Sequence, residues 1–505
     1  MTQQIAQTVA IVIYFAAMIG IGLYANRRTN NLDDYMLGGR NLKPGTAALS
    51  AGASDMSGWL LMGLPGAIFV SGLVEAWIAI GLTIGAWLNW KFIAPRLRSY
   101  TEVSHNSITI PSFLDNRLKG GSRMLRIVAG VIILVFFTFY VSSGMVAGGL
   151  FFQSSFGSTY HAGLLLVAGV TIGYTLFGGF LGATYTDVVQ GVMMFAALLL
   201  VPIVGIIGVG GFGQMAENIT AVDPDALSLV RGATVVGVVS ALAWGLGYFG
   251  QPHIIVRFMA MRSPSDAKYG RRIGIGWMVL SVIGGIATAL VGIAYYGNRP
   301  DEAPTDPESV FLDLAQVFFH PVIAGFVLAA VLAAIMSTVS SQLIVSSSAL
   351  VEDLYKLTVK EEPSARKQVW LGRAGVGAVA LVATSLAWQQ NNTILGLVAF
   401  AWAGFGAAFG PIVILSLFWR KLTSLGAITG MALGAVTVFV WTVTPWADLY
   451  EIIPGFVVCT VAAVAVSLAT YRHDPEVERE FDSAAELAHA AQDEMKAAKA
   501  ESAVS

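Results

Sequence analysis

SAGASDMSGW (Ser50–Trp59) lies in the first half of an apolar run from Thr46 to Val70. At roughly 25 residues, that run is long enough to cross a bilayer as a helix. It carries one acid, Asp55, and an ionised Asp at the bilayer centre costs about 2.5–3.5 kcal/mol on insertion scales. The surrounding small residues and glycines allow the helix to unwind and to free backbone carbonyls and amides. We therefore predict a broken helix that forms half of a site for an ion and a solute.

A second interpretation of the same stretch is a face for helix packing. Small residues let two helices approach closely, and Asp55 would then hydrogen-bond to a neighbouring helix. We prefer the broken helix because Gly52, Gly58, Gly63 and Gly66 interrupt a single run.

The composition indicates a protein with many membrane spans. The chain has 505 residues, of which 56% are apolar and 12% charged. A formal net charge of −2 argues against nucleic acid as a partner, and membrane lipid is expected instead. The single cysteine, Cys459, can form no intramolecular disulfide. Arg27 and Arg28 follow the first apolar run, the reverse of a cleavable signal peptide, so we expect a retained helix with its N-terminus outside.

The sequence contains 13 apolar runs that are long enough to cross a membrane. They begin near Ile5, Thr46, Leu73, Leu125, Ala162, Val188, Gly232, Ile273, Pro321, Leu371, Ile394, Ala427 and Ile452. When the runs are threaded alternately, all but two of the 29 basic residues fall on the inside; Arg231 and Arg299 are the exceptions. This places the C-terminus in the cytoplasm. From His473 the composition predicts a short solvated helix or a disordered tail.

A second interrupted helix lies five spans after the first, in residues 241–252. Glycines and Pro252 break that run, and paired breaks in two halves of a chain indicate a transporter site between inverted repeats. Trp244 and Tyr248 are four residues apart and therefore share one face of the helix. An interfacial aromatic belt is the alternative, but Trp244 lies about a dozen residues into its helix, near mid-depth.

The ninth apolar run supplies hydroxyl groups. Ser337 and Thr338 follow two alanines that allow close helix approach. With carbonyls from an unwound segment, they would offer the oxygen ligands that a hard cation prefers. Hydroxyls in membrane helices also bond to their own backbone, and the pattern alone does not separate the two possibilities. For Ser346, Ser347 and Ser348, near the inner end, we predict backbone bonding.

Together these segments resemble the sodium/solute symporter family and, within it, bacterial sodium/proline symporters. The resemblance extends to about Tyr471 and is carried by Leu37-Gly38-Gly39-Arg40, Leu49–Ile68, Trp244–His253, Met336-Ser337-Thr338 and Ala401–Pro411. It implies an all-α polytopic membrane protein in which a leucine-transporter-like core of two five-helix inverted repeats lies among the 13 transmembrane helices. The expected divisions are a first helix and cytoplasmic loop (1–45), two repeats (46–231 and 232–419), two further helices (420–471) and a cytoplasmic tail (472–505).

The resemblance also implies the residues of a site. Sodium would be bound by the carbonyls of Ala53, Met56 and Ala334 and the hydroxyls of Ser337 and Thr338, with Asp55 as a ligand or a nearby charge. Proline would lie between the broken helices, in contact with Ser57, Gly58, Trp59, Tyr140, Trp244, Tyr248 and Pro252. Arg40 and Asp187 match positions that we expect to act in gating or coupling. Half-helix amino ends would suit the carboxylate of proline, and aromatic faces its ring.

The expected function is sodium-coupled uptake of L-proline by alternating access across a bacterial cytoplasmic membrane, with sodium as the co-transported ion. Symport of another small solute stays open, because only the resemblance singles out proline. An ion channel is disfavoured because the two helix breaks include no ring of repeated filter residues. An enzyme is disfavoured because the six histidines are scattered and form no cluster with acids or metal ligands.

Overall fold

The computed structural model describes residues 3–27, 42–107, 109–120, 123–355, 364–390 and 392–504. Within these ranges the regular structure is helical, and one isolated β-bridge joins Leu42 to Met261. The all-α prediction is therefore confirmed. Arg40 and its motif lie outside the described residues.

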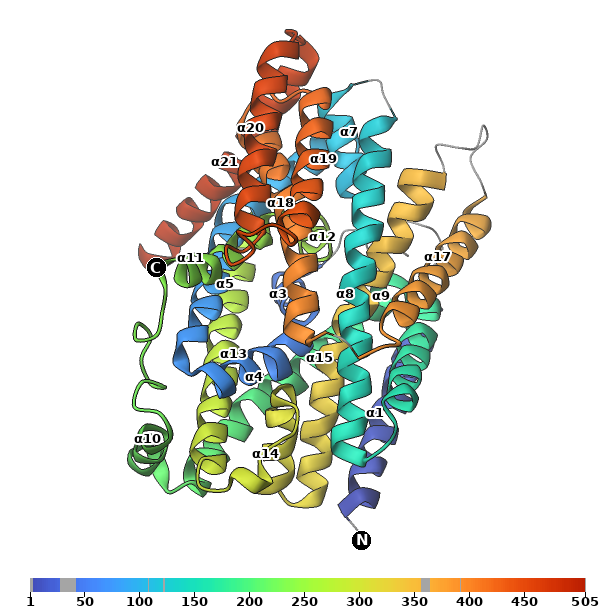
Figure 1. Cartoon of the computed structure of the whole chain (residues 1–505). Helices are drawn as coiled ribbons and strands as arrows, with labels where there is room; N and C mark the ends of the chain where they lie inside the picture. The colour runs from blue at the N-terminus through green and yellow to red at the C-terminus, as the bar shows by residue number, and fades with distance from the viewer. Residues whose placement is uncertain are drawn as a thin grey trace.

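The helices pack as one bundle with α3 near its centre, against α13, α9 and α12 (Figure 1). The first half of the chain forms α1 (Gln3–Asn26), α3 (Pro44–Asp55), η2 (Trp59–Gly63), α4 (Leu64–Ser71), η3 (Leu73–Glu75), α5 (Ala76–Leu88), η4 (Asn89–Ile93), α6 (Ala94–Val103), α7 (Ile110–Leu118), α8 (Met124–Phe156), α9 (Tyr160–Gly208) and α10 (Gly211–Val222). The second half forms α11 (Val235–Ala243), η5 (Trp244–Gly250), α12 (Pro252–Met259), α13 (Asp266–Tyr296), η6 (Pro300–Glu302), η7 (Pro307–Ser309), α14 (Val310–Phe318), α15 (Pro321–Ser348), η8 (Ala349–Tyr355), α17 (Ala365–Leu386), α18 (Ile394–Phe418), α19 (Ser424–Trp441), α20 (Ile452–Thr470) and α21 (Pro475–Val504).

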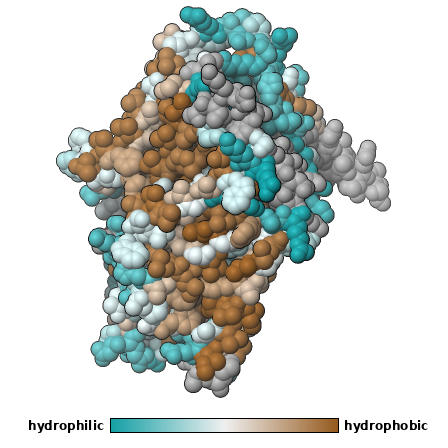
Figure 2. Space-filling model, turned by 90° about the vertical axis from the view of Figure 1, so that its right-hand side faces the viewer, coloured by the Kyte–Doolittle hydropathy of each residue, from teal (hydrophilic) through white to brown (hydrophobic). Residues whose placement is uncertain are grey.

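The outer surface of the bundle suits a membrane. In the described part of the chain, 10 helices are long and apolar enough to cross one, and two shorter apolar helices cover residues 59–71 and 235–250. Figure 2 shows hydrophobic side chains over the middle of one face and hydrophilic ones gathered towards its two ends. In the span that contains α15, 83% of an 18-residue apolar window is buried, so this part of the helix lies inside the bundle rather than against lipid.

The first predicted helix break is confirmed. Helix α3 ends at Asp55, Met56 leaves the helical region at φ −78° and ψ 75°, and helical structure resumes with the π-helical turn η2. The backbone amide of Ser57 bonds to the carbonyl of Asp55 at 2.9 Å instead of continuing the helix. A side chain at Gly58 would lie 3.2 Å from the Cβ of Ala147, so glycine allows α8 to approach closely.

The second predicted break is confirmed in the same way. Helix α11 ends at Ala243, a 3-10 segment follows, and Gln251 is extended before Pro252 starts α12. Proline suits that first helical position, because an amide hydrogen there would have no acceptor within the helix and its absence loses no hydrogen bond. Two side chains from other helices hold the broken segment: Trp402 Nε1 donates to the Trp244 carbonyl at 2.8 Å, and Asn89 Nδ2 to the Tyr248 carbonyl at 2.9 Å.

Two predicted runs, which begin near Ala162 and Val188, lie together in α9. This stretch of 49 residues consists of two helical parts that meet at Gly179, where φ is 55° and ψ is −154°. A side chain would be strained in that conformation, so glycine permits the change of direction.

The tail forms a helix that is docked rather than fully solvated. On α21, Phe481 and Ala484 are buried, and the Phe481 ring packs edge-on against Tyr100 with 6.2 Å between centroids. Lys119 forms ion pairs with Glu476 at 2.7 Å and Glu480 at 2.6 Å. We call the end of the bundle that carries α7 and α21 the tail face.

Candidate functional site

Four of the predicted sodium ligands lie together where α3 meets α15. The Ser337 hydroxyl donates to the Ala53 carbonyl at 2.7 Å and lies 3.0 Å from the Ala334 carbonyl. The Thr338 hydroxyl reaches the same Ala334 carbonyl at 3.4 Å. All four residues are buried. These neutral oxygens are the donor set that a hard cation prefers, and a bound cation would replace the hydroxyl-to-carbonyl hydrogen bonds.

No hydrogen bond among the described residues ties the other two predicted ligands, the backbone carbonyl of Met56 and Asp55, to this cluster. The Met56 sulfur accepts a hydrogen bond from Trp277 Nε1 at 3.0 Å, on the side of α3 that faces α13. The Asp55 carboxylate accepts a short hydrogen bond from the Tyr248 hydroxyl through one oxygen. Its other oxygen, Oδ1, is buried without a hydrogen bond among the described residues. Asp55 therefore links the two broken helices, while its backbone carbonyl accepts from Trp59 Nε1 at 2.8 Å.

Four of the predicted solute residues are buried close to the two helix breaks. Trp59, Tyr140, Trp244 and Tyr248 are each at most 6% exposed. The Tyr140 hydroxyl lies near Asp55 and Ser57 but has no hydrogen-bond partner in the described structure. The Tyr248 ring packs edge-on against Trp402 at 5.1 Å. The ring of Trp244 instead stacks on Tyr450 at 5.4 Å, so in this conformation α20 and its preceding loop cover one face of it.

A small cavity lies on the side of the junction that faces α13. It has a volume of about 20 Å³ and is lined by Asp55, Met56, Tyr248 and Trp90, among others. That volume holds about one water molecule, and proline is larger. Proline would therefore enter this cavity only if helices move apart.

A buried ion pair lies about one helical turn from the cation cluster. The Asp187 carboxylate accepts hydrogen bonds from Ser50 at 2.7 Å, Ser54 at 3.2 Å and Arg257 at 3.2 Å. Arg257 also donates to the Ser341 hydroxyl at 2.7 Å. Both charged residues are at most 1% exposed, and the network joins α3, α9, α12 and α15.

Sequence reasoning missed the role of Arg257. We counted it only among the inside basic residues, although its position five residues after Pro252 was a usable signal. A charge inside an otherwise apolar run marks a functional or paired group.

A carboxylate also closes the end of the bundle opposite the tail face. The two carboxylate oxygens of Glu308 accept from the backbone amides of Ile394 at 2.8 Å and Leu395 at 3.0 Å, the start of α18. A side chain at Gly66 would lie 2.9 Å from the Glu308 backbone, so η7 packs tightly on α4. Burial raises the pKa of the Glu308 carboxyl above its usual range, although the two amide bonds oppose that shift.

The hydroxyls near the end of α15 depart in one place from the prediction. Ser346 donates to the Gln342 carbonyl at 2.8 Å and Ser348 to the Val345 carbonyl at 2.9 Å, as predicted. For Ser347 the prediction is wrong: its hydroxyl donates to the Gly372 carbonyl of α17 at 2.6 Å. This bond ties two helices together, because Gly375 lets α17 approach Ser347 closely.

Comparisons with known proteins agree with this geometry. The model of the sodium:solute symporter family matches residues 35–434. The high-affinity proline transporter PutP of Bacillus subtilis is 56% identical over 466 residues, covering 92% of this chain and 98% of that protein. The sodium/proline symporter of Escherichia coli is 49% identical over 486 residues, covering 96% of this chain and 97% of that protein.

Solved structures show the same fold. A Na⁺-coupled sialic acid symporter, in a substrate-bound outward-open state, superposes with a TM-score of 0.80 at 19% identity, over 93% of this chain and 99% of that one. Mhp1, a nucleobase-cation-symport-1 family transporter, superposes with a TM-score of 0.57 at 14% identity, over 89% of this chain and 98% of that one.

Proposed function

The chain belongs to the sodium:solute symporter family, and we propose that it carries L-proline into the cell together with sodium. The observation that carries the proposal is the convergence of carbonyl and hydroxyl oxygens from Ala53, Ala334 and Ser337 beside the break in α3. Proline is the solute because the relatives at 49% and 56% identity are named as proline transporters.

The proposed topology has 13 crossings. It counts α9 as two crossings that meet at Gly179 and counts each broken helix once. The first repeat then covers 46–231 and the second 232–419, with residues 1–45, 420–471 and 472–505 outside them. The tail face is cytoplasmic and the N-terminus lies outside, because this orientation leaves the excess of basic residues inside.

Sodium acts on the solute site through the end of α3. When the ion binds to the Ala53 carbonyl and the Ser337 hydroxyl, it draws the end of α3, just before the break, towards α15. The hydrogen bond between Tyr248 and Asp55 then couples the position of α3 to that of the second broken helix. The unpaired Asp55 Oδ1 and Tyr140 hydroxyl are available to the solute ammonium group or to the ion.

Alternating access requires that the two ends open in turn. On the side opposite the tail face, Glu308 holds η7 and α4 against the start of α18. On the tail side, the Asp187–Arg257 pair joins α3 and α12 to α9 and α15. Opening either end therefore requires that these buried polar contacts break.

Removing either hydroxyl of the cation cluster should raise the sodium concentration for half-maximal uptake. Ser337→Ala and Thr338→Ala each delete one neutral oxygen ligand, and a loss of about 1 kcal/mol corresponds to roughly a fivefold increase. Ser346→Ala is the matched control, because its hydroxyl bonds only within α15. Uptake of labelled proline by proteoliposomes at varied sodium concentration measures all three. Equal shifts at the three positions would assign Ser337 and Thr338 to ordinary helix bonding.

One sodium should move with each proline, because the oxygens of one cluster at Ala53 and Ser337 form the proposed cation site. Zwitterionic proline adds no net charge, so each cycle moves one positive charge. A potential of about 100 mV contributes about 2.3 kcal/mol and a tenfold sodium gradient about 1.4 kcal/mol, which together support accumulation on the order of 500-fold.

The reversal potential of proteoliposomes at varied sodium and proline gradients measures this ratio. A ratio near two would require a second sodium site elsewhere in the chain. Saturable uptake that needs sodium supports the symporter itself. Proline flux that neither saturates nor depends on sodium would reject the proposed function.

A further inference from the structure

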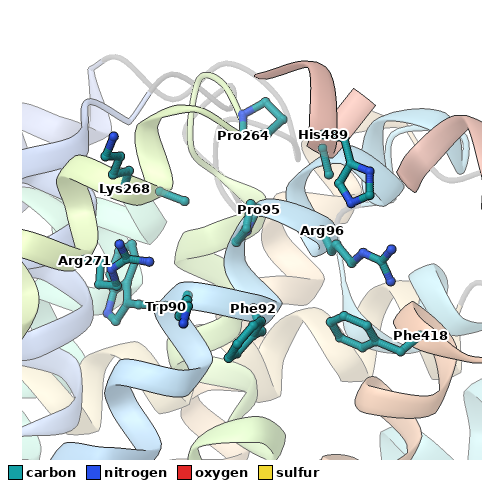
Figure 3. Close-up of a pocket in the computed structure, with 12 residues that line it drawn as sticks. Trp90, Phe92, Pro95, Arg96, Pro264, Lys268, Arg271, Phe418 and His489 are labelled. Carbon is teal, nitrogen blue, oxygen red and sulfur yellow. The ribbon is translucent and has the colours of Figure 1, made fainter. Parts of the chain in front are cut away.

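A basic pocket of about 450 Å³ opens at the tail face. It lies between η4 and α6, the start of α13, the end of α18 and the tail helix α21. Its lining includes Lys91, Arg96, Lys268 and Arg271, and no carboxylate among the described residues. Figure 3 shows Lys268 and Arg271 on one side of it and Arg96 with His489 on the other. We call it the basic pocket.

Three acids on the elements that form this pocket are paired with other cations. The described pairs are Glu102 with Arg98, Asp266 with Arg262, and Asp482 with Arg420. Neither Lys268 nor Arg271 has an ion pair within the described part of the chain. The Arg96 guanidinium bonds to the Leu417 carbonyl at 2.8 Å, which leaves its charge uncompensated. Four like charges around one hollow favour binding of an anion.

Exposed aromatic rings border the same pocket. Phe92 and Phe418 line it and are 44% and 42% exposed. The Lys91 ammonium lies 4.4 Å from the centroid of the Trp87 ring, which is 39% exposed. Aromatic rings and long cations gather where membrane helices meet the headgroups. A soluble anion would contact the cations alone, whereas a phospholipid in the pocket would contact both the cations and these rings.

We propose that the basic pocket binds the headgroup of an anionic phospholipid from the cytoplasmic leaflet. The phosphate lies between Lys268 and Arg271, and the glycerol and upper acyl chains cover Phe92 and Phe418. The tail helix forms one wall through His489. Bound lipid would therefore hold α21 against the bundle.

The basic pocket also shares a wall with the transport site. Trp90 lines both this pocket and the small cavity beside Asp55. Its ring fits against α13 so tightly that a side chain at Gly270 would lie 2.6 Å from it. A ligand bound in the basic pocket would therefore affect how α13 packs against the first broken helix.

Binding of phosphatidylglycerol with a fluorescent acyl chain tests the site on the purified full-length protein in neutral detergent at fixed salt. Lys268→Gln/Arg271→Gln should weaken binding about 30-fold, or about 2 kcal/mol for two cations. Arg272→Gln is the matched control: the neighbouring cation on α13 is exposed and outside the pocket, so its variant should keep most of the affinity. Lys91→Gln, on another element, should weaken binding about fivefold.

The unfolding temperature and the gel-filtration profile of each variant establish that it is folded. If the double variant is not folded, Lys91→Gln tests the pocket in its place. Equal losses for Arg272→Gln and the pocket variants would overturn the proposal in favour of diffuse charge attraction. Displacement of the lipid by inorganic pyrophosphate at similar concentration would assign the pocket to a soluble anion. Equal affinity for phosphatidylcholine would show that the cations do not select the ligand. Each of these three results rejects the lipid site without bearing on proline transport.

Discussion

Replacing Arg257 by methionine is expected to destabilise the protein by about 3–5 kcal/mol, because Asp187 is then left buried without its cation. The loss is large since water does not reach the carboxylate to replace the guanidinium. Proline uptake should fall below detection, because the network that joins four helices has lost its centre. The unfolding temperature in detergent and uptake in proteoliposomes measure the two effects.

The double variant Asp187→Asn/Arg257→Met separates charge from shape. It removes both charges, so most of the lost stability should return, whereas transport should stay impaired if the pair acts in closing the tail side. The control is Arg262→Met, whose pair with Asp266 lies at the surface and contributes at most about 1 kcal/mol. An Arg257→Met protein as stable as wild type would show that Asp187 is neutral or otherwise paired.

Replacing Asp55 by asparagine is expected to weaken the response to sodium by roughly 10- to 100-fold. The charge of Asp55 favours a nearby cation, and a charged hydrogen-bonding group contributes about 1.5–3 kcal/mol. Asparagine keeps the volume and still accepts from Tyr248, so folding should change little. Sodium titrations of proline uptake and of binding measured by calorimetry give the shift.

Tyr248→Phe is the matched variant for this test. It removes only the hydroxyl that bonds to Asp55 and keeps the ring against Trp402. Proline affinity should fall more than sodium affinity, because the second broken helix loses its tie to the first. If Asp55→Asn left the sodium requirement unchanged, the carboxylate would serve only to join the two broken helices.

Local sequence was sufficient to place the two helix breaks. Glycines around Asp55, and glycines with Pro252 in the second run, act on their own backbone, and no partner is needed for that effect. The pattern singled out Ser337 and Thr338 but left cation binding and backbone bonding open, and only the resemblance pointed to Ala53 and Ala334 as their neighbours. The 13 spans and their orientation are predictions that rest on apolar length and basic residues alone.

The partners of the polar side chains could not be predicted in this way. Asp55 bonds to a tyrosine 193 positions along the chain, and Ser347 bonds to α17 rather than to its own helix. Helical spacing indicates which residues share a face, but it does not indicate which helix that face meets. Helix α15 is buried on most of its surface, so its hydrophobic pattern does not single out one face for a particular neighbour.

The sequence by itself therefore determined the membrane class, the family resemblance and the positions of the two breaks, because each depends on neighbours along the chain. Only the tertiary structure decided that Arg257 pairs with Asp187, that Tyr248 holds Asp55, and that α21 packs on the bundle. These contacts join segments far apart in sequence, and their geometry is set by how whole helices pack. An apolar pattern indicates that a helix face is buried in the bundle, but it does not indicate which helix that face packs against.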